Sequence, residues 1–261
     1  MKHFLFLCLI SVSGLSSDCM LVENNDEEEN FQAKLLHELA ERSHPQGKLE
    51  RVIKLRVAKE KSIDLKNAHG ETPFITALRV GNAHAAHLFF HGGCDYNATD
   101  RDGKTTINLA CQAGDVNTVK ELLAKNVQLD QRNKDGDTPL HSVSLSSEWL
   151  TQGYSALELC AYQALCADMI LGKATRLGKK RDLLAQPDAY KRTPADRACW
   201  SNVCALSVFV KHGAVIHPIW VPIMADTHLK CLRLLRSEIA QNKQQENHAE
   251  EVLVENFNKT I

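Results

Sequence analysis

The sequence predicts an all-α protein, a solenoid of stacked helix-turn-helix repeats, and two observations support this prediction. The first is a period of 33 residues, marked by Gly70, Gly103 and Gly136. The second is that the context of each glycine recurs with it, as NAHGETPF, DRDGKTTI and NKDGDTPL. A unit of this length holds two short helices and a connecting loop, and neighbouring units must stack to bury their apolar faces.

Each part of the unit has a local physical cause. An Asp or Asn opens a tight turn, and the glycine accepts the positive φ that other residues resist. A threonine then caps the first helix, and in three copies a proline takes the first helical position. These residues are Thr72, Thr105, Thr138 and Thr193, with Pro73, Pro139 and Pro194. Gly81 and Gly114 end the first helix, and a second helix follows with apolar residues at helical spacing. In one copy these apolar residues are Val119, Leu122 and Leu123.

A fourth copy, DAYKRTPA, begins at Asp188, so an insertion of 22 residues separates it from the third, and Lys191 replaces its turn glycine. The apolar residues of YSALELCAYQALCADMIL predict that the insertion lengthens a second helix. The following GKATRLGKKR is expected to form an enlarged basic loop, either solvated or a docking point for an anionic partner. Its basic residues are Lys173, Arg176, Lys179, Lys180 and Arg181.

The segments DGDTPLHSV and GDVNTVKELLAKN resemble the ankyrin repeat family, and the resemblance extends from about Phe31 to Pro218. It implies a repeat domain over residues 31–243 and a role in binding other proteins without catalysis. The units are expected near residues 31–66, 67–99, 100–132, 133–187 and 188–217, followed by C-terminal capping helices at 218–243.

The two ends of the chain have different compositions from the repeats. Residues 1–17 are predicted to be a secretory signal peptide, because a basic start precedes an apolar run from Phe4 to Val12 and a small-residue cleavage point. An uncleaved anchor is the alternative. Residues 18–30 are expected to form an acidic linker, and residues 244–261 a polar tail. The signal predicts an exported protein, either secreted or periplasmic.

Charge and motifs argue against nucleic-acid and nucleotide binding. Acidic residues number 32 and Lys plus Arg 31, so no overall field attracts nucleic acid. ATDRDGKTT resembles the phosphate loop G-x-x-x-x-G-K-[ST], but Ala98 replaces its first glycine. Lys104 becomes Glu71 and Asp137 in the sister copies, so the segment is interpreted as a repeat turn. No cofactor and no small-molecule substrate are predicted.

A stripe of histidines is the strongest metal-ligand pattern. His84, His87 and His91 lie on one face of a predicted second helix, and Cys94 follows them. Nitrogen and sulfur ligands at this spacing could bind zinc or copper. The buried positions of this helix are expected to be Ala85, Ala86, Phe89 and Phe90. A solvated polar face is therefore the favoured interpretation, and no metal site is predicted.

The histidine and cysteine side chains that could act as a general base or a nucleophile are interpreted as contributing to the fold and not to catalysis. The family resemblance implies that His141 hydrogen-bonds between units, at a position where the other copies carry Ile75, Asn108 and Asp196. Removal of the signal would leave eight cysteines, for which free buried thiols are expected. Pairing of residues 199 with 204, or 160 with 166, stays open. Cys111 and Cys199 share the inner position of Leu78, which indicates packing rather than catalysis.

The predicted function is recognition of a partner protein by a concave surface made of turn tips and the exposed side of the first helices. The tip residues are Ala68, His69, Arg101, Asp102, Lys134, Asp135, Ala189 and Tyr190. The first helices are expected to add Arg79, Asn108, Gln112, Ser142 and Trp200. Tyr190 and Trp200 are the expected hot spots, because large amphipathic rings contribute most when a partner desolvates them.

The sequence does not identify the partner, and a host-cell or periplasmic protein would suit an exported, monomeric repeat domain. Stacked units would present the surface rigidly, so little ordering entropy opposes association. Two alternatives stay open: an adaptor for a membrane surface or an anionic partner that uses residues 173–181, and an enzyme built around the insertion. No catalytic motif accompanies the insertion, so the protein is not predicted to be an enzyme.

Overall fold

The computed structural model describes residues 25–41, 47–144, 155–217 and 219. These residues form helices, with one isolated β-bridge between Thr99 and Thr105. The all-α class is therefore confirmed for the described part of the chain. The predicted signal peptide, the capping helices at 218–243, apart from residue 219, and the polar tail lie outside the described residues. No helix within the described ranges is both long and apolar enough to span a membrane.

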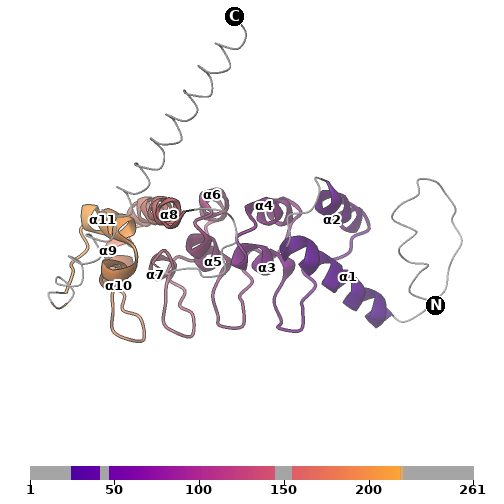
Figure 1. Ribbon diagram of the computed structural model, residues 1–261, viewed down its shortest axis with the longest axis horizontal. Coiled ribbons are helices and arrows are strands. Elements are labelled where there is room, and N and C mark those ends of the chain that lie inside the picture. Colours follow the sequence, from indigo (N-terminus) through magenta and orange to yellow (C-terminus); the bar gives the residue numbers. More distant parts are fainter. Residues whose placement is uncertain (1–24, 42–46, 145–154, 218, 220–261) are drawn as a thin grey trace, which may run out of the picture.

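The helices lie in two rows (Figure 1). One row holds the first helices of the units, which are α1 (Asn25–Glu41), α3 (Pro73–Arg79), α5 (Thr106–Ala113), α7 (Pro139–Ser142) and α10 (Pro194–Ser201). The other row holds the second helices, which are α2 (Lys48–Ala58), α4 (Ala83–His91), α6 (Val116–Ala124), α8 (Ala156–Arg176) and α11 (Val203–Lys211). The short α9 (Lys180–Ala185) follows α8. Helices of each row pack against their counterparts in the next unit, which is the arrangement of a solenoid.

The predicted helix starts and stops are confirmed. The hydroxyls of Thr72, Thr105 and Thr193 each accept a hydrogen bond from the backbone N–H three residues later. A proline follows three of the four capping threonines at the first helical position, as the sequence indicated. Gly81 and Gly114 adopt positive φ after α3 and α5, so the chain can turn directly into the second helix.

The hydrophobic core runs between the two rows. Each unit contributes fully buried apolar side chains, including Leu36, Phe74, Phe89, Leu122, Leu140, Leu171 and Phe209. Cys111 and Cys199 are buried at the position of Leu78, as predicted. In α4 the side chains of Ala85, Ala86 and Phe89 are buried and Phe90 is half-buried, which leaves the histidines of this helix exposed.

One of two unusual elements differs from expectation and the other agrees with it. The predicted acidic linker was wrong over residues 25–30, because α1 already begins at Asn25. Acidic residues at a helix N-terminus interact favourably with the helix dipole, so this composition also suits a helix start. The insertion does lengthen a second helix, since α8 has 21 residues and packs against α6 and α11.

Candidate partner-binding surface

The turn of each unit is closed by one side chain. The carboxylate of Asp100 accepts hydrogen bonds from the backbone N–H groups of Asp102 at 2.9 Å and Lys104 at 2.8 Å. Gly103, at φ 76°, donates its N–H to the Asp100 carbonyl. The same double contact is made by Asn67, Asn133 and Asp188 in the other units. In the fourth turn Lys191 adopts φ 61°, so the geometry persists without glycine.

Successive turns also hydrogen-bond to one another. The N–H of Lys134 donates to the carbonyl of Asp102 at 2.9 Å, and the N–H of Ala189 donates to the carbonyl of Asp135 at 2.8 Å. The guanidinium of Arg132 donates to the carbonyl of Pro187. All the turns project beyond the first helices on the same side of the solenoid (Figure 1). The tips therefore form one row, in which the second, third and fourth turns are hydrogen-bonded to one another.

The row presents mixed charge and one large aromatic ring. Every predicted tip residue is exposed: Ala68, His69, Arg101, Asp102, Lys134, Asp135, Ala189 and Tyr190. Two successive tips each pair a basic residue with an acidic one. Tyr190 is 72% exposed, and the guanidinium carbon of Arg192 lies 4.7 Å from the centre of its ring. This cation–π contact and the Asp188 bond to the Tyr190 N–H hold the ring in place without covering it.

The first helices add two polar positions beside the row. Arg79 is 40% exposed and forms a 3.1 Å ion pair with the buried carboxylate of Glu71. One unit later Gln112 is half-buried, and its side-chain oxygen lies 3.4 Å from the ammonium of Lys104. Both positions therefore border the surface while bonded to their own turn. The side chain of Trp200 lies outside the described part of the structure.

Asn108 and Ser142 do not belong to this surface, so their assignment to it was wrong. Both side chains are fully buried. The Asn108 amide donates to the carbonyl of Asp137 in the next turn at 3.4 Å, and the Ser142 hydroxyl donates to the carbonyl of Thr138 at 3.4 Å. Asn108 therefore faces the next unit and Ser142 bonds within its own helix, so neither side chain lies on the open side.

His141 joins two units, as the family resemblance implied. Its Nδ1 accepts the N–H of Thr138 at 3.2 Å, and its Nε2 lies 3.0 Å from the carbonyl of Arg192 in the next turn. The Asn108 amide makes the equivalent contact one unit earlier. Burial lowers the pKa of His141, and the bond to Arg192 only partly opposes this effect.

We expect His141→Asn to keep the contact between units and to reduce the loss of stability in mild acid. The unfolded imidazole binds a proton below about pH 6.5, whereas the folded one, with its lowered pKa, binds it only at lower pH. Wild-type stability should therefore fall as the pH drops through this window. Urea unfolding at about pH 7.5 and about pH 5.5 measures the effect.

His37 should retain part of the pH dependence in this variant, because burial lowers its pKa too. A His141→Asn protein that loses as much free energy of unfolding between the two pH values as the wild type would contradict the assignment. The unfolding slope with urea should stay the same in both proteins, because the substitution leaves the buried area unchanged.

A buried ionic network lies directly behind the tips of the third and fourth turns. Arg197, whose side chain is 14% exposed, forms an ion pair with Asp137 and lies 3.8 Å from Asp188. Arg192 pairs with Asp188 at 2.7 Å. Burial by itself would raise the pKa of Asp188, but the hydrogen bonds and charge of Arg192 outweigh it, so the pKa lies below its ordinary value. The network links α10 to both turns.

The basic segment is not an enlarged loop, so that prediction was wrong. Lys173 and Arg176 lie on the last turn of α8, and Lys180 and Arg181 lie on α9. The Lys173 ammonium lies 2.6 Å from Asn126, and Lys179 pairs with Asp130 at 3.0 Å. After a turn at residues 177–179 the chain forms α9, in which Leu183 and Leu184 are buried in the core. Lys173 thus ties α8, and Lys179 the N-terminus of α9, to the preceding unit.

Four of the described cysteines are buried free thiols. These are Cys94, Cys111, Cys166 and Cys199, whereas Cys160 and Cys204 are half-buried. Burial raises the pKa of the Cys166 thiol to about 12 and that of Cys199 to about 11. Such thiols remain protonated near neutral pH, which suits packing and not nucleophilic chemistry.

Sequence reasoning missed one residue that lies beside the exposed histidines. Glu121 of α6 approaches His87 and His91 of α4, whereas His84 and Cys94 do not join this cluster. The 33-residue period contains a signal for this proximity, because it aligns Glu121 with Leu88 on the neighbouring second helix. Side chains one period apart lie next to each other in a stacked array.

Paired helices stacked in two rows, with hydrogen-bonded turns along one edge, define the class of tandem helical repeat proteins. The family model "Ankyrin repeats (3 copies)" matches residues 79–171. The chain therefore contains ankyrin repeats, which are modules for protein–protein interaction and are typically not enzymes.

Three relatives illustrate this similarity. Inversin from Gallus gallus is 30% identical over 90 residues, which make up 34% of this chain and 8% of inversin. Alpha-latrotoxin-Lhe1a from Latrodectus hesperus is 30% identical over 100 residues, or 38% of this chain and 7% of the toxin. Protein phosphatase 1 regulatory subunit 27 from Mus musculus is 30% identical over 94 residues, or 36% of this chain and 61% of the subunit. The chain thus matches less than two thirds of each relative.

Proposed function

We propose that this protein is exported and binds a partner protein through the turn-tip surface, which we define as the exposed tip residues together with Arg79 and Gln112. The observation that supports this proposal best is the row of turns, hydrogen-bonded to one another from the second to the fourth, in which every predicted tip side chain faces solvent. Backbone bonds between turns fix the spacing of the tips before any partner arrives. Association then requires little ordering of the chain, which favours affinity.

The chemistry of the surface indicates a partner with charges of both signs. Arg101 and Asp102 lie on one tip, and Lys134 and Asp135 on the next, so a strongly basic or strongly acidic partner would meet repulsion at every second position. Tyr190 offers a large exposed ring at the far end of the row, where a partner pocket could cover it. A host-cell or periplasmic protein is the partner proposed for an exported domain.

The alternative proposal, an adaptor that uses residues 173–181, rests on fewer available charges. Lys173 and Lys179 already bond to Asn126 and Asp130, while Arg176 and Arg181 are exposed. Sedimentation with anionic liposomes distinguishes the two proposals. Binding to vesicles that is abolished by Arg176→Gln and Arg181→Gln together would favour the adaptor.

Site-specific photo-crosslinking tests the main proposal. We would place p-benzoylphenylalanine at residue 102 on the turn-tip surface and, in a separate protein, at exposed Arg51 on α2 in the second-helix row. The same partner protein should crosslink to the first site and not to the second. Equal crosslinking at both sites, or crosslinking only at Arg51, would contradict the assignment of the surface.

A further inference from the structure

An open groove runs between α4 and α6, in the second-helix row and away from the turn tips. Its lining includes His84 and His87 from α4, Thr118 and Glu121 from α6, and Asp115 at the N-cap of α6. The two helices belong to successive repeats and pack against each other. A ligand held by side chains from both helices would therefore bridge two units.

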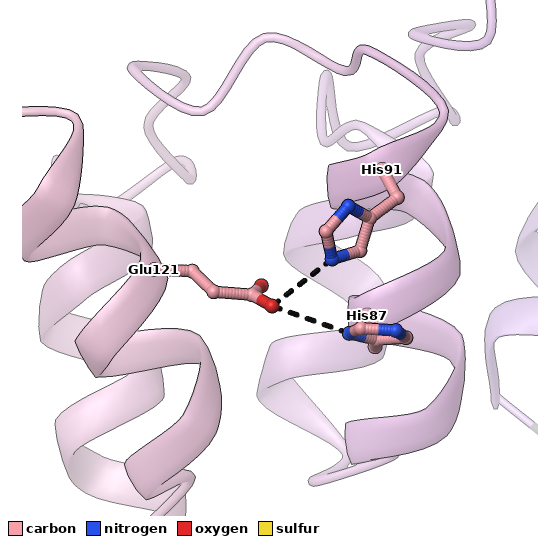
Figure 2. Close-up of side chains that lie close together, drawn as sticks. All are labelled: His87, His91 and Glu121. Atoms are coloured by element: carbon pink, nitrogen blue, oxygen red, sulfur yellow. Dashed lines mark hydrogen bonds and ion pairs between the residues drawn. The ribbon is translucent and has the colours of Figure 1, made fainter.

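At the side of this groove two histidines converge on one carboxylate oxygen of Glu121. The Nδ1 atom of His87 lies 3.3 Å from Oε1 of Glu121, and the Nε2 atom of His91 lies 3.0 Å from the same oxygen (Figure 2). The two imidazole rings meet edge to face, with their centres 4.3 Å apart. The i and i+4 spacing puts both rings on one face of α4, and Glu121 reaches them from the neighbouring helix.

The ligand types and distances also fit a shared metal ion. Two histidine nitrogens and one carboxylate oxygen are a ligand set for zinc, which leaves a fourth position for water. Metal–ligand bonds near 2.1 Å in a tetrahedron separate neighbouring ligand atoms by about 3.4 Å. The potential ligand atoms of the three residues all lie within 4.8 Å of one another, so small side-chain rotations would bring them into position.

The second carboxylate oxygen gives an independent indication. Oε2 of Glu121 is buried and has no hydrogen-bond partner among the described residues. A buried carboxylate oxygen without a partner is unfavourable unless a positive charge compensates it. A divalent cation bound at Oε1 would supply that charge from the solvent-accessible side.

We propose that His87, His91 and Glu121 are the ligands of one divalent transition metal ion. The expected ion is Zn²⁺. The ligand set differs from the pattern of His84, His87, His91 and Cys94 that the sequence analysis considered. Cys94 is buried and His84 lies outside the cluster, whereas Glu121 comes from the next unit. Bound metal would join the units at residues 67–99 and 100–132 and so stabilise the stack.

Calorimetric titration of the untagged, chelator-treated full chain with Zn²⁺ tests the proposal. The wild type should bind one equivalent, and His87→Ala, His91→Ala and Glu121→Gln should each weaken binding by about ten-fold or more. His84→Ala is the matched control, because it removes an exposed histidine from the same helix and should leave the affinity unchanged. Circular dichroism of each variant shows that the fold is retained.

Co²⁺ substitution identifies the ligand atoms. A site of two imidazoles and a carboxylate should give visible d–d absorption without an intense near-ultraviolet thiolate charge-transfer band. Three results would overturn the proposal: no uptake of one equivalent of Zn²⁺ by the wild type, wild-type affinity in the His87→Ala/His91→Ala double variant, or a thiolate band with Co²⁺. The exposed histidine variants keep the test decisive even if Glu121→Gln fails to fold.

Discussion

Arg197→Met is expected to destabilise the protein by about 3–5 kcal/mol at neutral pH, because it leaves the carboxylate of Asp137 buried without its guanidinium partner. Asp188 would retain Arg192, so Asp137 accounts for most of the loss. Methionine approximates the apolar length of arginine and limits the contribution from a cavity. The midpoint of urea denaturation, followed by circular dichroism, measures the change.

A second substitution separates the charge effect from the packing effect. Adding Asp137→Asn to the Arg197→Met protein removes the unpaired charge and should recover about half of the lost free energy or more. Arg101→Met, at an exposed tip, is the control and should change stability by no more than about 0.5 kcal/mol. If Arg197→Met costs no more than this control, the ionic network does not stabilise the fold.

Gly136→Ala should destabilise the fold by about 2–5 kcal/mol, since it combines two costs at the third turn. Gly136 has φ 75°, where a side chain costs about 1–2 kcal/mol. Its new Cβ would also lie 2.9 Å from the backbone N of Ala189 and 3.3 Å from the carbonyl carbon of Asp188. The fourth turn must then move, which weakens the bond from Ala189 to Asp135 that keeps the tips in register.

Gly103→Ala is a matched control because it shares the strain without the clash. Gly103 has φ 76°, and the nearest atom to its added Cβ would be 3.6 Å away, at ordinary contact distance. It should therefore cost only about 1–2 kcal/mol. Urea denaturation of both variants, with hydrogen exchange at the Ala189 amide, measures the difference. The account would be contradicted if both variants lost the same free energy of unfolding and Ala189 exchanged at the wild-type rate. Close contact between turns would then not hold the row together.

The repeat architecture was predictable because its determinants are local. The turn Asp or Asn, the glycine and the capping threonine act within a few residues, so their 33-residue recurrence identifies the unit directly. At Lys191 the local pattern is incomplete, because this residue replaces the turn glycine. The fourth turn keeps its form without glycine because Asp188 closes it and the contact with Asp135 supports it.

The errors concern side chains whose environment depends on a neighbouring unit. Asn108 looks like a polar surface residue of a short helix, yet its equivalence to His141 places it against the next turn. The basic segment looks like a loop by composition, but the burial of Leu183 and Leu184 requires a helix. Glu121 joins the histidines only when α4 and α6 stack, which no pattern within one helix reveals.

The affinity of the crosslinked partner for tip variants tests the central claim most directly. With the partner purified, Tyr190→Ala should raise the Kd by about 30-fold, since loss of an interface anchor costs about 2 kcal/mol. Arg51→Ala, in the second-helix row, should leave the Kd within about two-fold of the wild type. If Tyr190→Ala and charge reversal at Asp102 and Asp135 all leave the Kd unchanged, while the variants remain folded, the turn tips are not the surface that binds the partner.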